Sequence, residues 1–416
     1  MSRIAYSLLL YLALPYVLLR LWWRSRRQPE YLQHIGERFG FYSDKPDASP
    51  LIWLHAVSVG ETRAADPLIR ALCDKYPDHR ILLTHMTPTG REAGVALFGD
   101  SILRMYLPYD YPGAVRRFLA HFRPRIGLLM ETEIWPNLVH ACKSRGVPLH
   151  LVNARLSEKS FANYQRMRAL TAPTLRDLTA IAAQTAADAQ RFTALGAPNV
   201  SVFGNLKFDV EPPAAQIAEG ARLRTSLGAR AVLLAASTRD GEELLFINNN
   251  LHLTPEAPNG LLILVPRHPQ RFNDVALMLE QHGVRYQRRS DNTALRADTQ
   301  VLLGDSMGEL FAYYAACDVA FIGGSLLPFG GQNLIEACAL GKPVLVGPHT
   351  YNFADAAESA IAAGAALRVM DAADLARKAS ALLTHPALMQ RMGEAALQFS
   401  KTHRGAAQKL LETLRF

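Results

Sequence analysis

Glu61 is the first residue whose type and setting suggest chemistry. It lies in the stretch HAVSVGETRAAD, from His55 to Asp66, between the apolar run LIWL and the helical pattern PLIRAL. Ser58 and Glu61 have the spacing of a capping box, in which the glutamate only secures a helix N-terminus. A carboxylate just beyond the carboxyl end of a strand is also well placed for a general base. The stretch supports both interpretations.

Two further carboxylates follow another buried apolar run, in the stretch METEIWPN from Met130 to Asn137. We expect Glu131 and Glu133 to face the same cleft as Glu61. Paired carboxylates can divide acid and base roles between them. Alternatively, one of them only positions a substrate hydroxyl or supports Arg155 in the stretch NARLS.

A glycine-rich stretch in the second half of the chain is typical of an anion site. In FIGGSLLPFGGQNLIEACALGKPVLVGP, a strand ends in Gly323, Gly324 and Ser325, and a second glycine pair precedes a helix. Glycine pairs let backbone N–H groups approach a phosphate, and a helix N-terminus adds a partial positive charge. The stretch ALGKP is not a Walker loop, because a proline follows the lysine, so ATP hydrolysis is not expected.

Asn333 and Glu336 have capping-box spacing at the start of that helix. Glu336 therefore either completes a cap or holds a pair of ribose hydroxyls, and a glutamate in the first turn can do both.

Basic and hydroxyl side chains at other strand ends extend this anion site. Arg267 and His268 follow a buried run in LVPRHPQR, and an arginine there suits a phosphate or carboxylate. The alternatives are a solvated loop arginine and a histidine that only packs or orients the loop. Ser237 and Thr238 end the run AVLLAAST and can donate to the same anion. Lys207, in GNLKFD, lies at a domain seam.

Two series of short apolar runs must position these residues. Most runs are continuous rather than alternating, as in parallel strands that are buried on both faces, and helical patterns separate them. The chain is therefore predicted to form two doubly wound α/β domains that face a cleft. The expected strands are 51–56, 80–87, 125–132, 148–155, 178–185 and 200–208, then 231–238, 260–269, 299–305, 318–325 and 343–348.

The domain seam is expected at FDVEPPAAQ, where a Pro-Pro pair closes the first series. This organisation resembles that of GT-B glycosyltransferases, which implies a terminal helix that packs back on the first domain. The predicted parts are a membrane anchor (1–27), an N-terminal Rossmann-like acceptor domain (28–208), a linker (209–229), a C-terminal Rossmann-like nucleotide-sugar domain (230–395) and a C-terminal helix (396–416).

The N-terminus is apolar from Ile4 to Leu19 and is followed by basic residues. This pattern predicts an uncleaved anchor, with the body of the protein on the cytoplasmic side of the inner membrane. Whether the segment spans the bilayer or lies in one leaflet stays open. Five of the net +8 charges belong to this region, which leaves +3 elsewhere and no basic, aromatic stripe for nucleic acid. The five arginines are Arg3, Arg20, Arg24, Arg26 and Arg27.

The chain shows no pattern of a metal centre or a disulfide framework. Its cysteines are far apart, and neither a D-x-D motif at a strand end nor a His/Asp cluster with ligand spacing is present. Reduced thiols and no metal cofactor are therefore expected. The four cysteines are Cys73, Cys142, Cys317 and Cys338.

Several of these stretches, in this order, closely resemble the 3-deoxy-D-manno-octulosonic acid (Kdo) transferases of lipopolysaccharide biosynthesis. The similar blocks are HAVSVGE, METEIWPN, NARLS, GNLKFD, PRHPQR, FIGGS, GGQNLIEA and VGPHTYNF. The resemblance covers the whole chain. It implies a GT-B glycosyltransferase that moves Kdo from CMP-Kdo to a lipid A precursor (lipid IVA) at the inner membrane face, with inner-membrane lipids as partners.

The resemblance also implies residue roles. Glu61 falls on the position of the family's catalytic base, and Glu131 is implicated in activity or acceptor handling. Many members have histidine where this chain has Gln332, which changes the expected donor contact there. The other implied donor residues are Lys207, Arg267, Gly323, Gly324, Ser325, Asn333 and Glu336.

The expected reaction is one in-line displacement with inversion, in which Glu61 takes the proton of the acceptor hydroxyl. CMP-Kdo has a single phosphate, so a metal clamp on the leaving group is less needed. The alternatives are another GT-B enzyme that uses a UDP-sugar, either a transferase or a 2-epimerase, and a non-catalytic membrane scaffold with the same fold.

Overall fold

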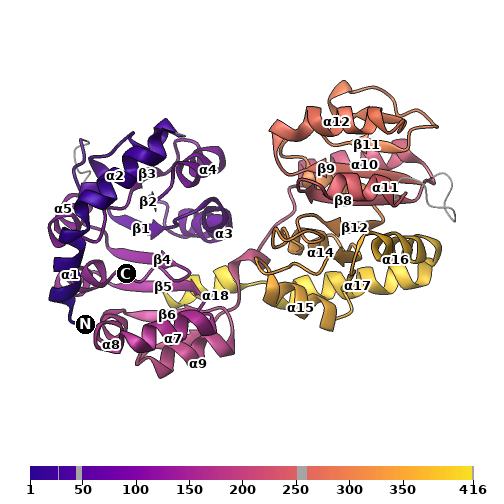
Figure 1. Cartoon of the computed structure of the whole chain (residues 1–416). Coiled ribbons are helices and arrows are strands. Elements are labelled where there is room, and N and C mark those ends of the chain that lie inside the picture. The colour runs from indigo at the N-terminus through magenta and orange to yellow at the C-terminus, as the bar shows by residue number, and fades with distance from the viewer. Residues whose placement is uncertain (27, 44–48, 251–259, 415–416) are drawn as a thin grey trace. The chain divides into compact units, whose positions relative to one another are not determined.

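The computed structural model describes residues 1–26, 28–43, 49–250 and 260–414. It divides the chain into two compact units (Figure 1). Unit 1 comprises Met1–Asp209 and Arg404–Phe416, and unit 2 comprises Val210–His403. Each unit is built around a parallel sheet.

The sheet of unit 1 has the strand order β3-β2-β1-β4-β5-β6-β7, and its neighbouring strands pair in parallel. The order reverses between β1 and β4, where Ile52 pairs with Ile126. Ligands of open α/β sheets bind beyond the carboxyl ends of the strands at such a reversal. The strands are β1 (Leu51–His55), β2 (Arg80–His85), β3 (Leu103–Tyr106), β4 (Ile126–Met130), β5 (Leu149–Ala154), β6 (Ala180–Ala183) and β7 (Val200–Val202).

Helices cover both faces of this sheet, because its strands are apolar on both sides. The first core cluster joins one face to α3 (Val59–Lys75), α4 (Pro88–Phe98) and α18 (Ala406–Thr413). The second cluster joins the other face to α5 (Pro112–Phe122), α6 (Pro136–Ser144), α8 (Arg168–Asp177) and α9 (Ala186–Ala194), and α7 (Glu158–Arg166) packs on α8.

The sheet of unit 2 has the order β10-β11-β9-β8-β12-β13-β14, again with parallel pairs. Its reversal lies between β8 and β12. The strands are β8 (Val232–Thr238), β9 (Leu261–Pro266), β10 (Tyr286–Arg288), β11 (Val301–Leu303), β12 (Val319–Ile322), β13 (Val344–Val346) and β14 (Ala366–Arg368).

One face of this second sheet packs on α11 (Glu242–Asn248), α12 (Phe272–Gln281), α16 (Ala372–Thr384) and α17 (Pro386–His403). The remaining helices of the unit are α10 (Ala214–Leu227), which packs on α13 (Leu310–Ala316), α14 (Ile335–Ala339), which packs on α17, and α15 (Ala354–Ala362), which packs on β14.

Three strands were not expected from the sequence: β3, β10 and β14. Each is a short strand at a sheet edge, and each contains an arginine, which interrupts the apolar run that predicts a strand. The segment expected as a linker, 209–229, contains helix α10. The single terminal helix expected over 396–416 is divided at Gly405, whose φ of 96° suits glycine, and α18 then packs on α3.

The apolar N-terminus forms two helices, α1 (Arg3–Leu12) and α2 (Leu14–Ser25), which are bent by 51° from each other. Pro15 lies at the start of α2, where its missing N–H removes a bond that a continuous helix would need. Among the described residues, no single helix is long and apolar enough to cross a membrane, although the bent pair together meets that condition. Arg27, at the end of the expected anchor, lies outside the described residues.

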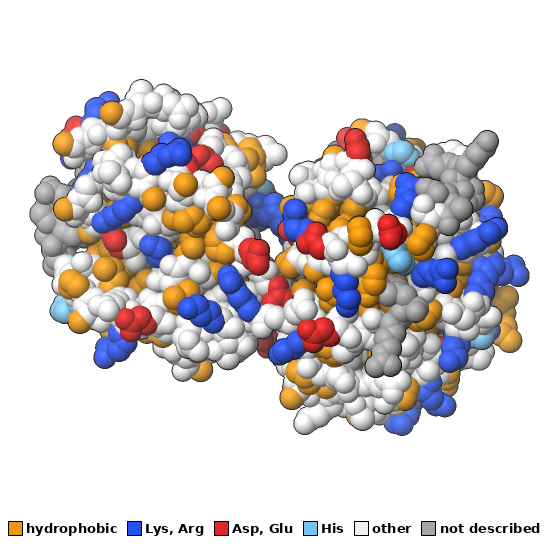
Figure 2. All heavy atoms as spheres, turned by 180° about the vertical axis from the view of Figure 1, so that it is seen from behind, with side chains coloured by type: hydrophobic (Ala, Val, Ile, Leu, Met, Phe, Trp, Pro, Cys, Tyr) orange, Lys and Arg blue, Asp and Glu red, His pale blue; other side chains and the backbone are white. Residues whose placement is uncertain are grey.

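Charged side chains of both signs are mixed with neutral and apolar ones on the face drawn in Figure 2. All four cysteines are free thiols. Burial raises the pKa of Cys142, Cys317 and Cys338 to about 12, so these thiols stay protonated at neutral pH.

Candidate functional site

The reversal in the sheet of unit 1 brings three acidic residues together. Glu61 lies in the first turn of α3, directly after β1, and Glu131 and Glu133 follow β4. The charges of Glu131 and Glu133 both act on Glu61. The strand order therefore places side chains that are 70 positions apart in the sequence within electrostatic reach of one another.

The capping interpretation of Glu61 holds in a modified form. Ser58 caps α3 by accepting a hydrogen bond from the Glu61 N–H at 3.4 Å. The Glu61 carboxylate accepts bonds from the Val57 N–H at 2.9 Å and from the Ser58 hydroxyl at 3.1 Å. Each carboxylate oxygen has two lone-pair positions, so these bonds leave acceptor capacity for a substrate proton.

The environment of Glu61 also suits a base. Burial raises its pKa to about 7, and the neighbouring charges of Glu131 and Glu133 add to this, whereas the bonds from Val57 and Ser58 oppose it. A base with a pKa near the working pH is both ionised often enough and strong enough to take a proton. A glutamate that only capped a helix would have no need of this setting.

Glu131 has an unusual backbone conformation, with φ of 55°. Its N–H still donates to the Val152 carbonyl at 3.0 Å, so Glu131 continues the hydrogen bonding between β4 and β5. The chain turns sharply only after this bond. A non-glycine residue in this region is strained, and such strain is common at functional sites. The Glu131 carboxylate lies 3.5 Å from the Lys207 ammonium, whereas Glu133 accepts a 2.8 Å bond from the Trp135 indole.

Lys207 is held in place by an amide network that the sequence did not reveal. It lies in a short 3-10 turn, η3 (Leu206–Phe208), whose first residues bond to neighbouring amide side chains. The Asn205 side chain accepts from the Lys207 N–H at 3.0 Å, and the Asn153 side chain accepts from the Leu206 N–H at 3.0 Å. Asn153 itself has φ of 51°, a left-handed backbone conformation that asparagine adopts more readily than most residues.

In unit 2, the loops after β8 and β12 meet at the reversal of the sheet. Gly323 packs so tightly there that a Cβ atom would lie 2.5 Å from the carbonyl oxygen of Ser237. Only glycine fits this close approach. Ser237 has φ of 58°, so its side of this crossing point is strained.

The sequence predicted that N–H groups of this glycine turn are open to a phosphate. Instead, two of them donate to a carboxylate of the protein itself. Glu242, which is fully buried, accepts bonds from the N–H groups of Gly324 at 2.6 Å, Leu326 at 3.0 Å and Arg239 at 2.9 Å. Glu242 thus ties the two loops together. The sequence gives no sign of this role, because nothing local distinguishes Glu242 from an ordinary glutamate in a first helical turn.

Two of the expected hydroxyl donors are also engaged inside the protein. The buried Thr238 hydroxyl donates to Glu243 at 2.6 Å. The buried Ser325 hydroxyl donates to the Ile322 carbonyl and accepts from the Gly347 N–H. In this conformation both side chains support the loops and do not present a hydroxyl to a ligand.

Several basic side chains also lie at this edge. Arg267, which follows β9, bonds Gln332 at 3.3 Å, and Arg239 bonds the His268 ring at 3.0 Å. Burial and the charges of Arg239, Arg267 and Arg271 lower the pKa of His268, which favours its neutral form. Arg271 is committed to a two-point bond with Glu243. Arg239 was not predicted, although its place directly after Ser237 and Thr238 could have indicated it.

Asn333 and Glu336 form a contact of their own near the start of α14. The Asn333 side chain accepts from the Ile335 N–H at 3.0 Å and donates to Glu336 at 3.1 Å. Asn333 and Glu336 therefore act together at the start of this helix, as their spacing indicated.

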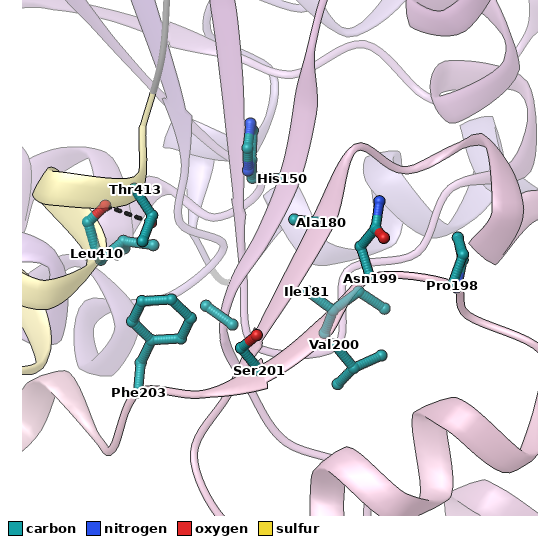
Figure 3. Close-up of a pocket in the computed structure, with 11 residues that line it drawn as sticks. His150, Ala180, Ile181, Pro198, Asn199, Val200, Ser201, Phe203, Leu410 and Thr413 are labelled. Atoms are coloured by element: carbon teal, nitrogen blue, oxygen red, sulfur yellow. Dashed lines mark hydrogen bonds between the residues drawn. The ribbon is translucent and has the colours of Figure 1, made fainter.

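A pocket lies elsewhere in unit 1, at the amino ends of β5, β6 and β7 (Figure 3). It has a volume of about 370 Å³ and is closed on one side by Leu410 and Thr413 of α18. Burial lowers the pKa of His150 in its wall to about 4, so this ring is neutral. The pocket contains none of the predicted site residues. Within the described ranges, no group of three His, Cys, Asp or Glu residues could hold a metal ion.

Comparison with known proteins gives consistent results. Residues 33–210 match the family described as 3-deoxy-D-manno-octulosonic-acid transferase (kdotransferase), and residues 279–399 match glycosyl transferases group 1. The 3-deoxy-D-manno-octulosonic acid transferase of Bordetella pertussis is 45% identical over 100% of this chain and 99% of the relative. That of Haemophilus influenzae is 39% identical over 100% and 98%.

A solved structure shows the same fold at low identity. The UDP-GlcNAc 2-epimerase of Neisseria meningitidis aligns with a TM-score of 0.59 and 16% identity, over 87% of this chain and 99% of that one.

Proposed function

Because the chain belongs to the 3-deoxy-D-manno-octulosonic acid (Kdo) transferase family of lipopolysaccharide biosynthesis, we propose that Glu61 is the general base of the transfer. The donor is CMP-Kdo and the acceptor is a hydroxyl of a lipid A precursor, lipid IVA. The acceptor oxygen attacks the anomeric carbon of Kdo, the bond to the phosphate of CMP breaks, and the configuration inverts. Glu61 takes the hydroxyl proton as the new bond forms.

The observation that carries this proposal is the setting of Glu61. Its carboxylate lies at the reversal of the sheet, has spare acceptor positions and has a pKa raised to about 7. Glu131 then acts as the neighbouring anion, which handles the acceptor or stabilises an oxocarbenium-like transition state. Lys207, 3.5 Å away, orients the Glu131 carboxylate.

The donor phosphate is assigned to side chains of unit 2 rather than to the glycine amides. Arg267 and Arg239 provide the positive charge, and a guanidinium forms paired bonds with phosphate oxygens. Neutral His268 and Gln332 provide further contacts to the donor, and the Glu336 carboxylate accepts bonds from its ribose hydroxyls. Because CMP-Kdo has one phosphate, these charges can stabilise the departing CMP without a metal cofactor.

The N-terminal helices are assigned to the inner membrane, with both units on its cytoplasmic side. Their outer faces expose apolar side chains next to arginines, which suits an anionic lipid surface. Flotation with anionic and with neutral vesicles tests this, since replacing Arg20, Arg24 and Arg26 by serine is expected to abolish the preference for anionic lipid.

Two variants separate the base from the cap. In Glu61→Gln, the amide oxygen still accepts a capping bond, but the side chain cannot take a proton. In Ser58→Ala, the cap is lost and the carboxylate remains. Kdo transfer to lipid IVA by detergent-solubilised protein is expected to be lost in Glu61→Gln and largely kept in Ser58→Ala.

CMP binding and thermal unfolding serve as controls for both variants. A Glu61→Gln protein that folds, binds CMP and transfers at the rate of the wild type would show that Glu61 is only a cap. The base would then be sought at Glu131 or Glu133.

A further inference from the structure

Helices α1 and α2 lie along the side of unit 1 (Figure 1). The two faces of α1 differ in their side chains. Its outer face is apolar, with Leu8 60% and Leu12 78% exposed. Its inner face carries two polar side chains, because Tyr6 and Ser7 are partly buried against the protein together with Ala5 and Leu10. A helix that only attached the chain to lipid would need no polar side chains on its inner face.

The polar face of α1 meets the start of α6, where a residue from another loop supplies the helix cap. Trp135 is the N-cap residue of α6, and its side chain makes no capping bond. Instead, Asp110 accepts bonds from the N–H groups of Asn137 at 2.9 Å and Leu138 at 2.8 Å. The Asn137 side chain returns a 2.7 Å bond to the Asp110 carbonyl.

Both residues of this cap are tied to α1. The Ser7 hydroxyl lies 3.0 Å from both the Asn137 side-chain oxygen and the Arg3 carbonyl, so these two acceptors share its one proton. The Tyr6 hydroxyl bonds the Asp110 carboxylate. Asp110 and Asn137 are each only 2% exposed. A buried polar cluster of this kind holds one arrangement only while each member is satisfied.

The start of α6 in turn determines the loop that carries the acidic residues. Only the five residues 131–135 separate the end of β4 at Met130 from the start of α6 at Pro136. The first of them, Glu131, is bound to the neighbouring strand through its N–H. A shift of the first turn of α6 must therefore be absorbed by the loop that holds Glu131 and Glu133.

We propose that α1 positions this loop for the reaction, and that Tyr6 and Ser7 are positioning residues that act through Asp110 and Asn137. The membrane helix is then part of the catalytic architecture as well as an attachment to lipid. The inference rests on the proposed role of the 131–135 loop.

The test uses full-length protein in detergent, where attachment to a membrane is not required. Tyr6→Phe/Ser7→Ala removes both hydroxyls but keeps the apolar outer face. Tyr16→Phe, on an exposed tyrosine of α2, is the matched control, and Ser7→Thr keeps the hydroxyl. All proteins carry Trp22→Phe and Trp23→Phe, so that fluorescence reports the partly exposed Trp135 in the loop above a background from the fully buried Trp53.

In Tyr6→Phe/Ser7→Ala, kcat is expected to fall about three- to tenfold, the equivalent of one lost hydrogen bond, with KM for CMP-Kdo unchanged. Acrylamide quenching of Trp135 is expected to rise. Ser7→Thr and Tyr16→Phe should match the reference protein in both measurements. If the double variant is unstable, Ser7→Ala alone should show both changes to a smaller degree.

Unchanged kcat in the double variant would overturn the proposal, and so would a lower kcat without a change in quenching. The quenching result does not depend on the identity of the base. Failure of the Glu61 assignment would instead appear as retained transfer in Glu61→Gln, so the two hypotheses fail in different experiments.

Discussion

The Lys207 ammonium lies 3.5 Å from the Glu131 carboxylate, and both side chains are about one quarter exposed. Glu131 follows β4, whereas Lys207 comes from the η3 turn that closes the first part of unit 1. The pair therefore joins the loop after β4 to the last turn before the chain enters unit 2. A lysine placed in this way can orient the carboxylate next to the proposed base.

The first prediction concerns this pair. Lys207→Gln and Glu131→Gln are each expected to lower kcat/KM for lipid IVA by about tenfold or more, the scale of one charge-assisted hydrogen bond. Because each residue acts through the other, the double variant should lose less than the sum of the two single losses. The rates of all four proteins check this, and strictly additive losses would show that the two residues act independently.

The second prediction concerns the pH dependence of the rate. The base must be ionised, and the pKa of Glu61 is raised to about 7, so kcat/KM should rise with pH and level off above about 7. The charge of Glu133 contributes to this raised pKa. Glu133→Gln should therefore move the rising limb to lower pH. A limb that stays in place, or moves to higher pH, would contradict the assignment of this limb to Glu61.

The third prediction concerns stability. Since the pKa of Glu61 in the folded protein is about 7 and its ordinary value is 4.5, the folded state holds the proton more tightly than the unfolded state. The wild type should therefore lose stability as pH rises through this interval, because ionising a buried carboxyl opposes folding. Glu61→Gln lacks this loss. Urea midpoints of both proteins at pH 5 and pH 8 test it, and parallel changes would contradict it.

The fourth prediction concerns Glu242. In Glu242→Gln, the side-chain NH2 group cannot accept a bond, so at least one N–H group of the glycine turn or of Arg239 loses its partner. An unsatisfied buried N–H costs about 1–3 kcal/mol, so the loops should loosen and CMP affinity should fall about tenfold. Calorimetric titration with CMP measures this.

Glu280→Gln, on the exposed side of α12, is the matched control for Glu242→Gln. Equal CMP affinity in both variants would show that the donor does not depend on the shape of this turn.

The sequence predicted the parallel α/β architecture because continuous apolar runs and helix caps are local properties. Each of the eleven expected strands contains an observed one, and Ser58 caps α3 as its spacing indicated. The three unexpected strands lie at sheet edges. A strand at an edge has a neighbouring strand on one side only, so its run of apolar residues is weaker. The bend between α1 and α2 is likewise local, since Pro15 interrupts the helix.

By itself, the sequence determined the family, the order of the strands along the chain and the candidate residues at their ends. Only the tertiary structure decided which of these residues meet. Strand order in the sheet brings Glu61 to Glu131, Glu242 occupies the amides of the glycine turn, and Asp110 caps a helix that begins 26 residues later. Such partners depend on the packing of segments that are far apart in the chain, and no local pattern of residues records them.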